Sequence, residues 1–180
     1  MKKNLFLILF TLVLSISLNA QPRNFEHLSF MNIPIDGSIT SFQNKLIAKG
    51  FVYDKIISQS IEGPTRYFTG QFAGESVGLY VYYDHDQKFV YRVKITISRE
   101  DVDQAISIMN KFRHLFEEKY GTAASSGTHE NWDAYSINLK NGAVDLFITE
   151  QTYTMGYTLH VDYWDFANTQ KHEANNMNDL

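Results

Sequence analysis

The feature that most constrains the fold is a regular alternation of apolar and polar residues from Phe89 to Ser98. Successive side chains of a strand point to opposite faces, so a period of two gives one apolar and one polar face. Such a strand packs one face against a core and leaves the other in solvent, which is typical of an antiparallel sheet. The alternation therefore predicts a sheet whose two faces differ, with Val90, Arg92, Lys94 and Thr96 on the open side.

Other runs rich in aromatic and β-branched residues predict further strands. Asn141-Gly142 lies between two of these runs and is a strong signal for a tight hairpin. Apolar residues at helical spacing predict one helix over residues 38–49 and a second over about 101–120. The further predicted strands span residues 51–58, 67–73, 77–83, 135–139, 144–149 and 157–164.

The resulting order is a helix, four strands, a helix and three strands, which predicts an α+β fold. We expect an antiparallel sheet with both helices packed on one face, built from two similar units at residues 28–98 and 99–166. A single domain then spans residues 21–167 and is followed by a polar flexible tail at 168–180. Two separate domains are the alternative, but units of about 70 residues have small cores.

Residues 1–20 have the three parts of a secretory signal peptide. Two lysines follow Met1, an apolar run covers residues 5–14, and a short polar exit ends at Ala20. We therefore predict cleavage after Ala20 and an exported protein, periplasmic or secreted, without stable membrane insertion. An N-terminal membrane anchor is the alternative, although the apolar run is shorter than a bilayer-spanning helix. A lipoprotein is not expected, because the sequence has no cysteine to carry the lipid.

Charge and cysteine content exclude several classes of protein. The chain has 16 Lys and Arg residues against 20 Asp and Glu, a formal net charge of −4. Without the two lysines of the predicted signal peptide, the chain has 14 Lys and Arg residues against 20 Asp and Glu, a formal net charge of −6. Nucleic-acid binders present a basic face, so no nucleic-acid partner is expected. The absence of cysteine rules out a disulfide framework, and a chain of this length buries a sufficient core without one.

Two segments of the chain resemble small exported proteins of unknown function from Bacteroides-type bacteria. The first has FMNIPIDGS at residues 30–38 and KGF at 49–51, and the second has FEEKYG at 116–121 followed by Trp132. The repeated order of a helix and strands is also similar to the architecture of secreted β-lactamase inhibitor proteins, which bind an enzyme through a sheet face. Those proteins are disulfide-bonded, so this resemblance concerns architecture alone. Neither family assigns a functional residue to this chain.

Three short motifs have the residue types of catalytic or metal sites. Residues 74–78 match the G-x-S-x-G nucleophile elbow, but a strand follows them, which favours a hairpin turn. Residues 84–86 (Asp-His-Asp) have metal-binding side chains, yet aspartates also favour turns and the ligand set of a calcium loop is missing. His160 and Asp162 share a strand face, as the orienting half of a catalytic triad would, but no nucleophile is identified. We therefore predict a protein that is not an enzyme and that has no metal site and no cofactor.

The open face of the sheet is the best candidate for a binding surface, because aromatic residues and arginine are enriched at protein interfaces. Aromatic residues are also ordinary strand residues that pair across neighbouring strands. The residues expected to point at the helices are Leu79, Val81, Tyr91, Val93, Ile95, Leu159 and Val161. The predicted binding residues on the opposite face are Tyr80, Tyr82, Arg92, Lys94, Phe147, His160 and Trp164.

These observations favour an exported, non-catalytic protein that binds a protein partner, in the cell envelope or outside the cell, through this aromatic face. A module that binds a glycan or another small envelope ligand is the alternative, since aromatic rings also stack on flat ligands. A small hydrolase that uses Ser76 or the His160–Asp162 pair is a third hypothesis.

Overall fold

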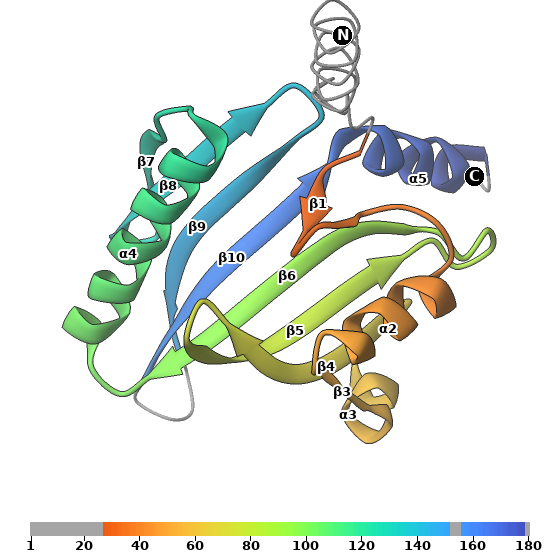
Figure 1. Ribbon diagram of the computed structural model, residues 1–180, viewed down its shortest axis with the longest axis horizontal. Helices are drawn as coiled ribbons and strands as arrows, with labels where there is room; N and C mark the ends of the chain where they lie inside the picture. Colours follow the sequence, from red (N-terminus) through yellow and green to blue (C-terminus); the bar gives the residue numbers. More distant parts are fainter. Residues whose placement is uncertain (1–26, 152–155, 179–180) are drawn as a thin grey trace, which may run out of the picture.

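The computed structural model describes residues 27–151 and 156–178, which form an α+β fold around one large antiparallel sheet (Figure 1). This confirms the predicted fold class. A small hairpin of β1 (Ser29–Phe30) and β2 (Ile33–Pro34) precedes the sheet. The helices are α2 (Ile39–Ala48), α3 (Lys55–Ser60), α4 (Val102–Tyr120) and α5 (Phe166–Asn178). In spatial order the eight strands are β3 (Val52–Asp54), β4 (Thr65–Phe72), β5 (Glu75–Tyr83), β6 (Val90–Arg99), β10 (Tyr157–Asp165), β9 (Gly142–Glu150), β8 (Trp132–Leu139) and β7 (Ser125–His129).

The sheet consists of two four-stranded meanders that meet at β6 and β10. α2 precedes β3–β6, and α4 precedes β7–β10, so a helix followed by four strands occurs twice along the chain. The two central strands pair antiparallel from Tyr157–Arg99 to Trp164–Arg92. This long ladder joins the two halves into one continuous sheet.

The second half has one strand more than the sequence pattern predicts. This strand, β7, has the sequence Ser-Ser-Gly-Thr-His, and all its residues are exposed. It lies at the sheet edge and pairs with β8 from Ser125–Ser136 to His129–Trp132. An edge strand held by backbone hydrogen bonds to one neighbour needs no apolar face, so hydrophobic periodicity does not reveal it.

The strand predicted at residues 51–58 is divided between β3 and α3. The Asp54 carboxylate accepts a hydrogen bond of 2.9 Å from the backbone N of Ile57 and caps α3. The Ser58 hydroxyl donates to the backbone O of Asp54 and accepts from the backbone N of Tyr67 on β4. These side-chain bonds turn the chain out of the sheet after β3.

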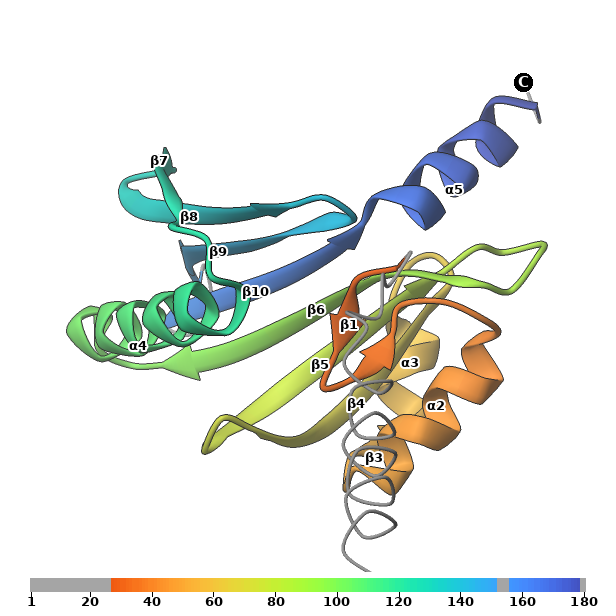
Figure 2. The ribbon, with the colours of Figure 1, turned by 45° about the horizontal axis from the view of Figure 1, so that its top comes forward.

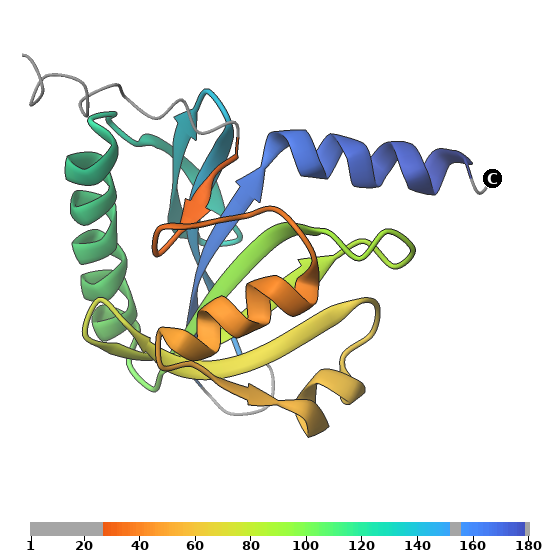
Figure 3. The same ribbon diagram turned by 45° about the vertical axis from the view of Figure 1, so that its right-hand side comes forward.

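Helices α2 and α4 lie on the same side of the sheet (Figures 1 and 3). Ser38 caps the start of α2, and Asp101 caps the start of α4 through its side-chain oxygen. Gly121 ends α4 in the left-handed conformation, with a φ of 64°. None of the described helices is long and apolar enough to cross a membrane. The core includes Phe42, Leu46, Met109, Phe112 and Phe116 from the helices, and Leu79, Val81, Val93, Ile95, Leu159 and Val161 from the strands.

The predicted Asn141-Gly142 hairpin is present, but the glycine has another role. The turn residues are Lys140 and Asn141, and Gly142 is the first residue of β9. A Cβ atom on Gly142 would overlap the backbone O of Trp164 and crowd Leu28. The glycine therefore permits a close approach of β10, rather than the turn itself.

Most of the segment predicted to be a flexible tail forms α5, which runs past the end of the sheet (Figure 2). The Asn168 amide donates to the backbone O of Ile35 and of Val90, at 3.0 and 2.9 Å. The carboxylate of Asp165 accepts from the backbone N of Asn168 and caps the helix start. Partners more than 70 residues away in the chain thus hold the helix, and local composition does not reveal them.

Candidate functional site

The predicted binding residues all lie on the face of the sheet opposite α2 and α4. Along their strands they alternate with residues that are buried in the core, and each remains partly exposed. Cross-strand pairing places Tyr82 beside Arg92, Arg92 beside Trp164, Tyr80 beside Lys94, and Phe147 beside His160. We call this surface the open face, formed by Tyr67, Tyr80, Tyr82, Arg92, Lys94, Asp145, Phe147, His160, Asp162 and Trp164.

Tyr91 departs from the predicted alternation. Tyr82 pairs with Arg92 but Tyr83 pairs with Val90, so Tyr91 is the extra residue of a β-bulge. Its ring stacks on His172 of α5, with the ring centroids 4.1 Å apart, and lies 6.5 Å from the ring of Tyr82. The predictions that Tyr91 points at the core helices and that Val90 lies on the open side are therefore wrong, because the bulge interrupts the period of two and Val90 is buried in the core.

Arg92 occupies the centre of the open face between two aromatic rings. Its guanidinium carbon lies 3.7 Å from the ring centroid of Trp164 and 4.9 Å from that of Tyr82. Its Nε donates to Asp162 Oδ1 at 2.8 Å, and a second guanidinium nitrogen donates to Asp162 Oδ2. Burial lowers the pKa of Arg92, but the hydrogen bonds and charge of Asp162 outweigh it and hold the pKa above its usual value. The guanidinium is therefore a fixed cation with an aromatic ring close to it on each neighbouring strand.

His160 lies beside this centre as a neutral imidazole. Burial, assisted by the charge of Lys94, lowers the pKa of His160 to about 3. Its Nε2 shares a hydrogen bond of 2.8 Å with the Thr149 hydroxyl, and its ring stacks on Phe147 at 4.7 Å between centroids. The Nδ1 atom is buried and has no hydrogen-bond partner in the part of the chain that the structure describes. The Asp162 carboxylate bonds Arg92 rather than this imidazole, so the two do not form the orienting half of a triad.

The remaining side chains extend the open face toward its first half. The ring of Tyr80 packs edge-on against that of Tyr67, with centroids 4.9 Å apart. Burial raises the pKa of Tyr80 and outweighs the opposing effect of its hydrogen bond with Thr96, so the phenol stays protonated. Lys94 Nζ lies 5.9 Å from the ring centroid of Phe147, and burial lowers its pKa. The face therefore presents aromatic rings with cationic groups between them.

A hollow of about 380 Å³ lies over the second half of the open face. Small residues of β7 and β8 leave this space, and Phe147 and Trp164 stand beside it. His129 closes one side, with its ring 4.5 Å from that of Phe147. The small lining residues are Ser125, Ser126, Gly127, Ala134 and Ser136.

Sequence reasoning does not identify several members of this surface. Tyr67 belongs to a predicted strand, but its face is unknown without the pairing of β4 and β5. Asp145 lies on β9, but the hollow beside it is formed in part by β7, a segment in which the sequence pattern predicts no strand. A repeat of the first four-strand unit is the signal that predicts a strand there.

The other motifs have structural roles. Residues 73 and 74 form the turn of the β4–β5 hairpin, and Ser76 follows on β5, where its hydroxyl accepts from the Gln71 amide. Asp84 is buried and accepts hydrogen bonds from the backbone N of Asp86 and of Gln87. These contacts confirm the hairpin-turn interpretations. The described residues contain no group of three or more His, Cys, Asp or Glu side chains arranged to hold a metal ion.

Comparisons with known proteins give no relative for this chain. No family model matches it, and neither the curated proteins nor the solved structures contain a significant match.

Proposed function

We propose that this chain is an exported, non-catalytic binding protein that engages a protein partner through the open face of its sheet. The observation that carries the proposal is the central cluster in which Arg92 is held by Asp162 between Trp164 and Tyr82. Tryptophan, tyrosine and arginine are the residue types that contribute most to binding energy at protein interfaces.

The width of the open face supports a macromolecular partner. Its aromatic residues extend from Tyr67 on β4 to Phe147 on β9, across four strand spacings. At about 4.8 Å per spacing, this is about 19 Å. A protein partner that contacts about 800 Å² per side uses a patch of this scale, whereas one sugar ring covers a small part of it.

The side chains at the centre of the open face are already ordered in the free protein. The Asp162 side chain is 1% exposed and the Arg92 side chain is 22% exposed, so their ion pair stays in place in the free protein. Side chains that are already ordered lose less conformational entropy on binding, and this improves affinity.

The test is capture of a partner from envelope and culture-medium extracts, followed by titration of the purified partner. The bait is the chain from residue 21 onward, and the test variant carries Tyr82→Ala and Trp164→Ala. The matched control is Leu115→Ala, which removes a 42% exposed apolar side chain of α4. We expect the partner to bind the wild type and the control equally and to lose at least tenfold in affinity for the test variant. Equal binding by all three proteins would contradict the proposal.

A small ligand such as a glycan is the second candidate, and the hollow beside Trp164 favours it. Its volume of about 380 Å³ falls within the range of small-molecule sites. The Asp145 carboxylate and several hydroxyl groups line it, and these are acceptors and donors for a polyhydroxylated ring.

Tryptophan fluorescence separates the two candidates. The chain has two tryptophans, so a Trp132→Phe variant assigns the signal to Trp164. A saturable change with one soluble glycan from a panel, lost in Phe147→Ala, would support the small-ligand function. No change across the panel, together with a captured protein, would support the protein-binding function.

A further inference from the structure

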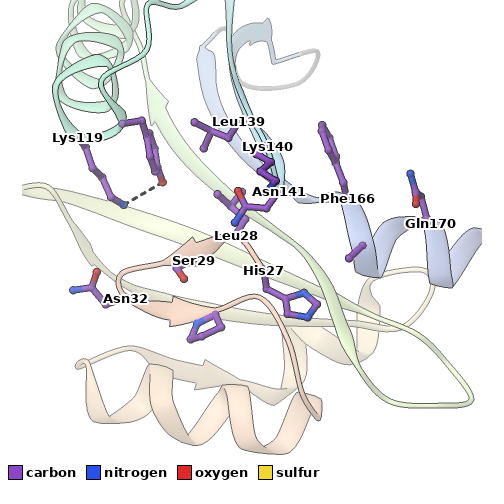
Figure 4. A pocket seen from close by; sticks show the side chains of 13 residues that line it. His27, Leu28, Ser29, Asn32, Lys119, Leu139, Lys140, Asn141, Phe166 and Gln170 are labelled. Atoms are coloured by element: carbon purple, nitrogen blue, oxygen red, sulfur yellow. Dashed lines mark hydrogen bonds between the residues drawn. The ribbon is translucent and has the colours of Figure 1, made fainter. Parts of the chain in front are cut away.

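A second and larger depression lies on the helix-bearing side of the sheet (Figure 4). It is a groove of about 1240 Å³, and we call it the helix-side groove. It is bordered by the β1–β2 hairpin, the end of α4, the β8–β9 turn and the start of α5. The residues used below are His27, Leu28, Lys119, Tyr120, Leu139, Lys140 and Phe166.

Two lysines give this groove a positive character. Lys119 and Lys140 both line it, and no aspartate or glutamate is among its described lining residues. In the described part of the chain, the ion pairs of lysine and arginine are Arg92–Asp162, Arg99–Glu75 and Lys111–Glu75, so neither groove lysine is neutralised by a carboxylate.

The surroundings of Lys119 and of His27 differ. Lys119 Nζ donates to the Tyr120 hydroxyl at 3.1 Å, and burial lowers the pKa of Lys119 (Figure 4). His27 lies beside two carboxylates, with its Nδ1 3.1 Å from Asp165 and its Nε2 3.8 Å from Asp36. The unpaired positive charge of the groove therefore belongs to the two lysines.

Apolar side chains line the same groove. Leu28 is buried at its base, and Tyr120 and Leu139 are partly buried. Phe166 is 41% exposed although it is a large aromatic residue, and its side chain stands at the groove rather than in the core (Figure 4). An exposed aromatic ring beside other apolar groups in a concave surface is typical of a ligand site.

We propose that the helix-side groove binds a small amphiphile that combines one anionic group with an apolar body. The anionic group pairs with Lys119 and Lys140, and the apolar body packs on Leu139 and Phe166. The volume exceeds that of most sites for drug-sized ligands, which suits an extended acyl chain. This site is separate from the open face and does not depend on the proposed function.

Isothermal titration with dodecanoate, below its micelle concentration, tests the proposal on the chain from residue 21 onward. Dodecyltrimethylammonium has the same chain length with a positive head, and acetate has the head without the chain. We expect saturable binding of dodecanoate, at least tenfold weaker binding of dodecyltrimethylammonium and no measurable binding of acetate. Equal binding of the two long-chain probes, or no binding of dodecanoate, would overturn the proposal.

Variants test whether dodecanoate binds in the helix-side groove. Lys119→Gln combined with Lys140→Gln is expected to weaken dodecanoate binding about tenfold, and Phe166→Ala is expected to weaken it as well. The matched control is Lys45→Gln, on the exposed side of α2, which should leave the affinity unchanged. Trp164→Ala should also leave it unchanged. Loss of dodecanoate binding in Trp164→Ala, with full binding in the double lysine variant, would assign the probe to the open face and refute the groove.

Discussion

The two halves of the sheet share one order of elements, but their open faces differ. In β3–β6 the open face is filled by large side chains, such as Tyr67, Tyr80 and Tyr82. In β7–β9 small residues, such as Gly127 and Ala134, leave a hollow beside Phe147. Open-face residues do not form the core, so they can differ while the repeated architecture is kept. Under the proposed function, both halves of this face would contact the partner, with the large side chains forming a flat surface and the hollow accepting a side chain of the partner.

The two halves meet at β6 and β10, and we call this junction the seam. Variants at the seam test most directly how the halves are joined. Arg92 belongs to the first half and Asp162 to the second, and their ion pair crosses the central pair of strands. Arg92→Ala leaves a buried carboxylate without its cation, which costs about 3 kcal/mol or more in the free energy of unfolding. Urea unfolding monitored by circular dichroism measures this loss.

A double variant separates charge from packing at this seam. Arg92→Leu with Asp162→Leu removes both charges, and replacement of a buried ion pair by apolar residues is close to neutral. We expect the double variant to recover most of the stability that Arg92→Ala loses. A loss of less than about 1 kcal/mol in Arg92→Ala would show that the seam does not depend on the pair.

Helix α5, which follows the second half, also contacts the first half by hydrogen bonds to Asp84. The stabilisation from this contact is expected to depend on pH. Burial of Asp84 raises its pKa, but hydrogen bonds from the backbone of Gln87 and from His172 and Asn175 outweigh it, and the pKa is about 2. Because the folded-state pKa is below the ordinary value of 3.8, the stabilisation is complete above about pH 4 and is lost as the pH falls toward 2. This shift corresponds to about 2 kcal/mol.

The free energy of unfolding, measured from pH 7 to pH 2, tests this linkage. Wild type should exceed Asp84→Asn by a margin that shrinks below about pH 4. Asp86→Asn, at a side chain that is 70% exposed, is the control and should follow the wild type. A margin that stays constant down to pH 2 would mean that Asp84 does not contribute through its charge.

Two glycines of the open face, Gly78 on the interior strand β5 and Gly127 on the edge strand β7, compare the halves with the smallest expected effects. A Cβ atom on Gly78, in the filled half, would lie 2.6 Å from the Tyr67 hydroxyl and 2.8 Å from that of Thr96. A Cβ atom on Gly127, in the hollow half, has nothing within 4 Å. Gly78→Ala should therefore lower the free energy of unfolding by about 1 kcal/mol, and Gly127→Ala should raise it by about 0.5 kcal/mol. Thermal unfolding of both variants checks the signs, and equal effects would contradict the difference in packing.

The sequence alone predicts the part of this site that hydrophobic alternation governs. From Arg92 onward, the alternation predicts which side chains of β6 face outward, and the buried Leu79, Val93 and Val161 confirm the register. Once one strand is oriented, its neighbours follow from pairing. The predicted binding residues therefore share one face as expected.

Three features depend on contacts that no local pattern records. β7 is polar and is held by pairing with β8 and by the contact of His129 with Phe147, and α5 is held by side chains such as Asp84 that are distant in sequence. The bulge at Tyr91 inserts one residue into a ladder whose composition remains that of a strand. Backbone pairing and long-range hydrogen bonds decide these features, so composition and periodicity do not predict them.

The most direct test of the central claim is the affinity of the captured and purified partner for three forms of the chain, measured by isothermal titration. The forms are the wild type, Tyr82→Ala with Trp164→Ala, and Leu115→Ala. The account predicts that only the open-face variant loses binding, by at least tenfold, while all three keep the same circular dichroism spectrum. Unchanged affinity in the folded open-face variant would contradict the claim that this face is the interface.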